Sequence, residues 1–293
     1  LNNLLVEPIF DPLKELLPHA LAKVVAIEGD ITLPLLGISP DNLNLLRKTV
    51  SVVIHSAATV KFDEPLNVAM NINLGGTNEV LELAESMELI KAVVYVSTAF
   101  SNCERSFIEE KIYPVRIDPV TAIAMYQNCD DDFLETITPV LLGDKPNTYV
   151  LTKHLAEELV NQRKMAVPVC VVRPSIVTAV YKHPIPGYVD NFNAMSGLLA
   201  GVMTGVVRTL LFNDQYFLDV VPLDYVVNLI IAAASKLSQT SERSELPAYV
   251  GDFFLGIVGR KRMFIPNFRK LGKNIDALRT RVVVKERRCP CAN

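Results

Sequence analysis

The chain has 293 residues, half of them hydrophobic and 21% charged, which is enough to bury a sizeable core and excludes disorder over most of its length. The net charge is −3, but residues 260–288 carry eleven Lys or Arg against two acids, so the remainder has a net charge of −12. A body with that charge is not expected to bind nucleic acid. The basic segment is expected to be a solvated tail, with contact to an anionic membrane as the alternative.

The cysteines and the apolar segments exclude further kinds of protein. The five cysteines show no paired framework, and Cys289 and Cys291 form one close pair without a second pair or a histidine, so no metal site is expected. No signal peptide opens the sequence, and no run of 18 or more apolar residues could span a bilayer. A reducing, cytosol-facing compartment fits this composition best.

The predicted elements alternate between helix and strand along most of the chain. Residues 1–20 have the pattern of an amphipathic helix interrupted by prolines, and residues 101–147 form a long polar connection. Strands are expected at 23–29, 51–58, 91–100 and 168–173, and helices within 33–48 and 68–88, around 149–153, within 194–209 and from about 222–224 onward. This alternation predicts an α/β fold with a parallel sheet and helices on both faces.

Tyr149 and Lys153 form the pair with the clearest chemical potential. They lie four residues apart in a segment with helical character, so both side chains fall on one helix face. A free tyrosine titrates near pH ~10, and a neighbouring ammonium favours the phenolate, which brings the phenol within reach of acid–base work near neutral pH. The same spacing also occurs by chance in many helices, so the pair alone favours a surface or half-buried contact.

Small and polar residues follow each expected strand at its carboxyl end. In a parallel sheet the ligand lies outside the carboxyl ends of the strands. The residues at those ends are Asp30, the His-Ser-Ala-Ala segment at 55–58, Ser97 with Thr98, and Pro174 with Ser175. Their convergence on one edge of the sheet predicts a binding site there.

Six short motifs resemble, in order, the extended short-chain dehydrogenase/reductase superfamily. They are Gly29-Asp30-Ile31, residues 55–58, residues 73–77 (Asn-Leu-Gly-Gly-Thr), residues 96–99 (Val-Ser-Thr-Ala), Tyr149-x-x-x-Lys153, and residues 173–177 (Arg-Pro-Ser-Ile-Val). Finer features at 97–102, 186–191, 201–208, 219–228, 247–249 and 259–261 resemble the fatty acyl-CoA reductases. The resemblance covers roughly residues 1–275. It implies a Rossmann-like NAD(P)-binding and catalytic domain over 1–240 and, over 241–293, a small, mostly helical remnant of the C-terminal domain with the basic tail.

Two parts of the family pattern are missing from the sequence. The family begins with a T-G-x-x-G-x-x-G loop, whose backbone N–H groups hold the cofactor pyrophosphate, and the sequence lacks this loop and the first two strands. The connection between residues 237 and 247 is also shorter than in the family. We therefore expect a truncated or alternatively joined reductase with an exposed hydrophobic sheet edge, poor solubility and weak cofactor binding.

The resemblance implies NADPH-dependent reduction of a long-chain fatty acyl-CoA to a fatty alcohol, by two hydride transfers through a bound aldehyde. Tyr149 would donate the proton, and Lys153 would lower the pKa of that phenol and bind the nicotinamide ribose. Thr98 would orient the substrate oxygen. Ser97 is the competing hydroxyl, because a shift of one residue along a strand changes which side chain faces the site.

The remaining cofactor positions follow from the resemblance alone, as does the choice of NADPH over NADH. No metal is implied. The positions are Asp30 and Ile31 at the adenine, Ala57 and Ala58 along the dinucleotide, Pro174 and Ser175 at the nicotinamide, and Asn73 as a structural support.

Two alternatives to this function remain open. One is another extended dehydrogenase, such as a sugar-nucleotide epimerase or a steroid-type dehydrogenase, which would share the Tyr–Lys pair. The other is a non-catalytic truncated isoform that binds lipid or a partner protein. The family resemblance implies a cytosol-facing place on a peroxisomal or endoplasmic reticulum membrane, or a soluble cytoplasmic one if the truncation removes the anchor.

Overall fold

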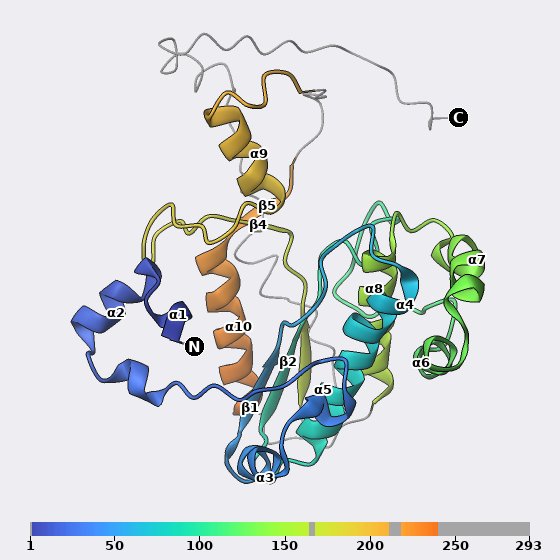
Figure 1. Ribbon diagram of the computed structural model, residues 1–293, viewed down its shortest axis with the longest axis horizontal. Helices are drawn as coiled ribbons and strands as arrows, with labels where there is room; N and C mark the ends of the chain where they lie inside the picture. Colours follow the sequence, from blue (N-terminus) through green and yellow to red (C-terminus); the bar gives the residue numbers. More distant parts are fainter. Residues whose placement is uncertain (1, 164–167, 211–217, 240–293) are drawn as a thin grey trace. The chain divides into compact units, whose positions relative to one another are not determined.

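The computed structural model describes residues 2–163, 168–210 and 218–239 (Figure 1). The described residues fall into two compact units, one formed by residues 2–174 and 227–239 and the other by residues 175–226. The predicted remnant at 241–293, including the basic segment, lies outside the described residues. The division at residue 240 therefore stays a prediction.

The first unit is built on a parallel sheet of three strands, β1 (Val52–His55), β2 (Ala92–Val96) and β3 (Val169–Val172), in that order. The register pairs Ile54 with Val94 and Val94 with Cys170. Nearly continuous runs of β-branched residues are typical of parallel strands that are buried on both faces. The predicted α/β, Rossmann-like fold is confirmed, and three of the four predicted strands form this sheet.

Helices cover both faces of the sheet (Figure 1). On one face, Tyr95 and Val171 pack with Leu155 of α8, in a core to which α4 and α5 also contribute. On the other face, Val94 packs with Leu229 of α10. The helices of this unit are α1 (Asn2–Leu5), α2 (Asp11–Leu16), α3 (Pro40–Thr49), α4 (Leu66–Ala69), α5 (Gly76–Glu85), α6 (Pro119–Asn128), α7 (Asp131–Leu142), α8 (Thr148–Gln162) and, from Val227 onward, α10 (Leu223–Ser238).

The expected strand at residues 23–29 is not formed. A 3-10 turn, Ala20–Lys23, is followed by extended backbone that pairs with no strand in the described part of the chain. The Asp30 N–H instead donates to the Leu36 carbonyl at 2.7 Å and closes a turn. An isolated extended segment gains no ladder hydrogen bonds, so β propensity alone does not make it a strand.

The outer edge of β1 is open among the described residues, because β1 pairs with β2 alone. The side chains of Val52 and Ile54 are 37% and 49% exposed. Val52 and Ile54 lie on the same face of β1, so their exposure shows an incompletely covered face, and the poor solubility expected from an open edge stays a prediction.

The polar connection expected at residues 101–147 contains two helices, α6 and α7. The Asp118 carboxylate accepts from the Thr121 N–H at 3.0 Å at the start of α6, and the Asp130 carboxylate accepts from the Phe133 N–H at 2.8 Å at the start of α7. An aspartate before a first-turn proline or acid is a helix-start signal. The sequence therefore contained the information for both helices.

The second unit contains two parallel strands, β4 (Ile176–Thr178) and β5 (Val220–Pro222), and the helix α9 (Ala194–Met203). The Asp224 carboxylate, at the start of α10, accepts from the N–H groups of Tyr181 and Lys182. Within the described ranges, no helix combines the length and the apolar character needed to cross a membrane.

Truncation of Leu155 to alanine should test the packing of α8 on the sheet. Leu155 is fully buried between α8 and the strands, so its loss should lower the free energy of unfolding by about 2–5 kcal/mol. Urea denaturation followed by circular dichroism measures this change. Val140→Ala is the control, because Val140 is 75% exposed on α7, and an equal loss in both variants would contradict the assigned core.

Candidate functional site

The site is built around the first two turns of α8. The Asn147 side chain accepts from the Val150 N–H at 2.9 Å and so caps the helix. Tyr149 and Lys153 follow on one face. The Lys153 ammonium is buried and donates to the Val96 carbonyl at 2.9 Å, which ties α8 to the last residue of β2.

The two hydroxyls after β2 point to different partners. The Thr98 side chain lies close enough to the Tyr149 phenol to lower its pKa, and the Thr98 hydroxyl oxygen accepts from the Phe100 N–H at 3.2 Å. The Ser97 hydroxyl donates to a carboxylate oxygen of Glu157 at 2.5 Å. The structure therefore brings Thr98, the first choice of the two, next to the phenol and engages Ser97 elsewhere.

Burial controls the protonation of the Tyr–Lys pair. It raises the pKa of the Tyr149 phenol, and the nearby Thr98 side chain offsets only part of this rise. It lowers the pKa of Lys153 to about 8, although the Glu157 carboxylate acts to raise it. The expected lowering of the Tyr149 pKa by Lys153 is not found here, because the ammonium is directed at the Val96 carbonyl and desolvation of the phenol dominates.

Asn73 connects the loop after β1 to α8. It lies in a short π-helix, Met70–Gly75, and its side chain is buried. Its amide oxygen accepts from the Thr59 N–H at 2.9 Å, while its amide nitrogen donates to the Thr59 carbonyl at 3.2 Å and the Thr152 hydroxyl at 3.0 Å. This bridging of backbone groups next to Lys153 fits the predicted supporting role.

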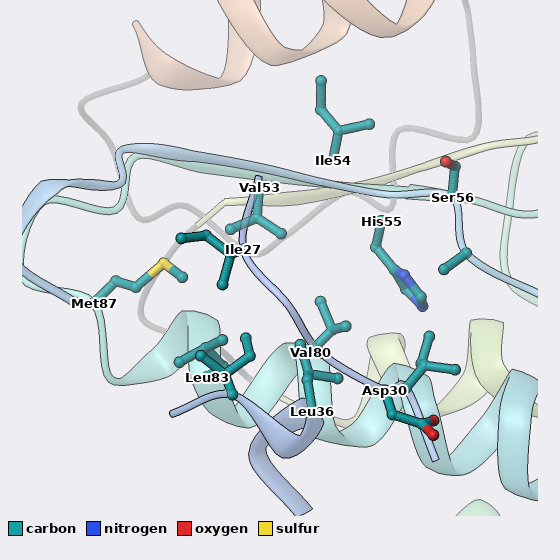
Figure 2. A pocket seen from close by; sticks show the side chains of 14 residues that line it. Ile27, Asp30, Leu36, Val53, Ile54, His55, Ser56, Val80, Leu83 and Met87 are labelled. Carbon is teal, nitrogen blue, oxygen red and sulfur yellow. The ribbon is translucent and has the colours of Figure 1, made fainter. Parts of the chain in front are cut away.

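A cavity of about 420 Å³ lies beside β1, at the predicted cofactor end of the site (Figure 2). Asp30, Ile31 and Ala57 line it, whereas Ala58 does not belong to its lining. The Asp30 carboxylate accepts from the N–H and the hydroxyl of Thr32, and these hydrogen bonds lower its pKa. Figure 2 shows apolar side chains from three segments facing this space, among them Ile27, Val53, Val80, Leu83 and Met87.

Gly76 allows the segment with Asp30 and Ile31, predicted to lie at the adenine, to pack closely on α5. A Cβ atom at Gly76 would collide with the side chain of Ile31, so only glycine lets this segment pack so closely on the start of α5. The second glycine of the Asn-Leu-Gly-Gly-Thr motif thus has a packing reason.

The end of β3 lies beside the turn after β2. The Pro174 carbonyl accepts from the Ala99 N–H at 2.9 Å, next to Thr98 in the chain. Ser175 is the first residue of the second unit, so its predicted place at the nicotinamide stays a prediction.

Sequence reasoning missed two features next to the Tyr–Lys pair. Glu157 is fully buried, one further turn along α8, and its carboxylate binds the Arg173 guanidinium at 2.6 Å. Phe62, in the loop after β1, is 64% exposed, and its ring lies 5.6 Å from the Tyr149 ring between centroids. The four-residue spacing from Lys153 was a signal that Glu157 lies on the same helix face. Nothing in the local sequence indicated that Phe62 lies beside Tyr149.

The histidines near the site have structural partners. His55 lies within hydrogen-bond distance of the Thr77 hydroxyl, 2.9 Å, and burial followed by the charge of Lys153 lowers its pKa to about 4. His154 lies 3.0 Å from the Tyr113 carbonyl. Within the described part of the chain, no group of three or more His, Cys, Asp or Glu side chains is arranged to hold a metal ion.

Comparison with known proteins identifies relatives of this arrangement. The family model described as "Male sterility protein", with the short name NAD_binding_4, matches residues 1–230. The chain is 42% identical over 226 residues to fatty acyl-CoA reductase 1 of Xenopus laevis, covering 77% of this chain and 44% of that protein. It is 43% identical over 232 residues to a putative fatty acyl-CoA reductase of Drosophila melanogaster, covering 79% of this chain and 45% of that protein.

Among solved structures, the terminal R domain from the myxalamid PKS-NRPS biosynthetic pathway is similar, with a TM-score of 0.55 and 25% identity over 76% of this chain and 50% of that one. The chain spans about half the length of the curated relatives that it matches. These matches confirm the resemblance to the fatty acyl-CoA reductases and support a reductase domain that binds a nicotinamide cofactor.

The buried ammonium of Lys153 should make stability depend on pH. Its pKa is about 8 in the folded chain and near 10.5 when unfolded, so between these values the unfolded chain binds the additional proton. Stability contributed by this group is therefore fully present above pH 10.5 and is lost as pH falls through about 8. The slope within this window should approach about 1.4 kcal/mol per pH unit.

Urea unfolding of the wild type and of Lys153→Met at several pH values between 8 and 10.5 measures this slope. The wild type should gain stability relative to the variant as the pH rises. Parallel curves for the two proteins would contradict the lowered pKa of Lys153 in the folded chain.

Proposed function

Because the chain belongs to the family described as Male sterility protein, we propose that it carries out the NADPH-dependent reduction of a long-chain fatty acyl-CoA to a fatty alcohol through a bound aldehyde. The observation that carries this proposal is the closeness of the Thr98 side chain to the Tyr149 phenol, with the buried ammonium of Lys153 bound to the Val96 carbonyl one turn further along α8. This is an arrangement suited to a carbonyl oxygen on which negative charge develops.

When bound, the nicotinamide cofactor supplies the hydride for each of the two reductions. The Thr98 and Tyr149 hydroxyls lie together and so bind the substrate oxygen jointly. Because its pKa is raised, the Tyr149 phenol is protonated at neutral pH and has a proton to donate. Breaking of the carbon–sulfur bond releases CoA as a thiol after the first reduction, and the second leaves the alcohol. One thioester therefore consumes two hydrides and two protons.

The residues at the cavity beside β1 fit the adenine end of such a cofactor. Ile27, Ala57 and Val80 offer apolar and small walls, and the Asp30 carboxylate at the cavity can accept from an amine. Lys153 would hold the ribose next to the nicotinamide. The preference for NADPH over NADH rests on the family resemblance.

Phe62 supports an apolar substrate. Its largely exposed ring adjoins the Tyr149 ring, so it offers apolar surface where the first carbons of an acyl chain would lie. We place the protein on the cytosol-facing side of a peroxisomal or endoplasmic reticulum membrane, and membrane contact through residues 260–288 is the alternative to a solvated tail. That basic segment lies outside the described residues.

Replacement of Tyr149 by phenylalanine tests the proposed reaction. Loss of the proton donor should lower NADPH-dependent thiol release from palmitoyl-CoA by about 10²–10⁴-fold with little change in thermal stability. Thiol release is followed with a chromogenic disulfide at saturating NADPH. Tyr181→Phe is the control, because Tyr181 is exposed in the second unit and should retain the wild-type rate.

The other functions give different outcomes in the same experiment. Turnover of a UDP-sugar or a steroid without thiol release would indicate another extended dehydrogenase. Absence of both NADPH binding and thiol release would overturn the proposal for this chain and favour a non-catalytic protein that binds lipid or a partner. Thiol release that Tyr149→Phe leaves unchanged would remove Tyr149 from the mechanism.

A further inference from the structure

Glu157 is a fully buried carboxylate on the face of α8 that carries the Tyr–Lys pair. It lies eight residues after Tyr149 and four after Lys153, so the three side chains follow one another along the helix. A buried charge is tolerated only where it is paired and hydrogen-bonded. The partners of the Glu157 carboxylate therefore show which parts of the fold this side chain connects.

These partners lie at the ends of two strands. One carboxylate oxygen accepts from the Ser97 hydroxyl at 2.5 Å, the Ser101 hydroxyl at 3.0 Å and the Arg173 guanidinium at 2.9 Å. The other oxygen accepts from Arg173 at 2.6 Å. Ser97 follows β2, and Arg173 follows β3. One side chain thus joins α8 to both strand ends.

Thr98 lies inside the turn that Glu157 holds. Ser97 precedes Thr98 directly, and Ser101 closes the turn, with its N–H 3.3 Å from the Thr98 carbonyl. Both serine hydroxyls bind the same carboxylate oxygen, so the two ends of the turn are attached to α8. Thr98, between them, has its side chain against Tyr149 on that helix.

We propose that Glu157 is a positioning residue that fixes the Thr98 hydroxyl against the Tyr149 phenol by holding the turn from Ser97 to Ser101. This role rests on the proposed carbonyl reduction, in which the two hydroxyls bind one oxygen. Arg173 neutralises the carboxylate and is itself held by the carbonyls of Glu109 and Lys111. A misplacement of about 1 Å between groups that bind one atom can lower a rate by about 10²-fold.

The decisive variant is the double substitution Ser97→Ala with Ser101→Ala. It removes both hydrogen bonds to the turn but keeps the Glu157–Arg173 ion pair, so it separates positioning from a purely structural role of the charge pair. The expected result is a kcat lower on the order of 10- to 100-fold, with KM for palmitoyl-CoA changed by less than about 3-fold. Glu157→Gln should likewise lower kcat and leave KM for palmitoyl-CoA nearly unchanged.

Glu158→Gln is the matched control. Glu158 is the next carboxylate on α8, is partly exposed and accepts from Asn161 and Gln162. It should leave kcat unchanged. If Glu157→Gln does not fold, as judged by circular dichroism, the double serine variant still decides the question.

A second measurement needs no substrate. The methyl resonance of Thr98, assigned through Thr98→Ser in protein labelled at threonine methyl groups, should shift in the double serine variant and stay in place in Glu158→Gln. An unchanged resonance together with a wild-type kcat overturns the positioning role. A shifted resonance in a protein whose wild type releases no thiol upholds the geometry and overturns the proposed function instead.

Discussion

The structure depends on the burial of α8 against one face of the sheet, with Lys153 held at the carboxyl end of β2. A helix that carries lysine and glutamate on its inner face can be buried only if each charge finds a partner. Lys153 binds the Val96 carbonyl, and Glu157 binds Arg173 and two serine hydroxyls. These contacts bring the phenol of Tyr149 to the ends of the strands, where the loops converge.

The same burial sets the chemistry of the site. Desolvation raises the pKa of Tyr149 and lowers that of Lys153, so near neutral pH the phenol holds its proton, while Lys153 lies within reach of titration. Glu157 limits the lowering of the Lys153 pKa, because its negative charge favours the protonated ammonium. The groups around that ammonium on other elements are His55 and Tyr95, both buried.

Much of the fold and of the site followed from the sequence. Valine-rich runs predicted β1, β2 and β3, and the four-residue spacing of Tyr149 and Lys153 predicted their common helix face. Aspartates that could start α6 and α7 were present but were outweighed by the polar character of residues 101–147. The segment at 23–29 has strand composition, yet whether such a segment becomes a strand depends on a neighbour that local composition does not reveal.

By itself, the sequence determined the three strands β1, β2 and β3, the helix that carries Tyr149 and Lys153, and the residues that follow these strands, because periodicity and the rules for parallel sheets act locally or through topology. Only the tertiary structure decided that Thr98 rather than Ser97 meets the phenol, and that Glu157 and Phe62 adjoin the site. These outcomes depend on side-chain directions and on contacts between residues distant in the chain. Burial in the folded chain also shifts the pKa values of Tyr149 and Lys153, and the residues next to them in the sequence do not reveal how deeply they are buried.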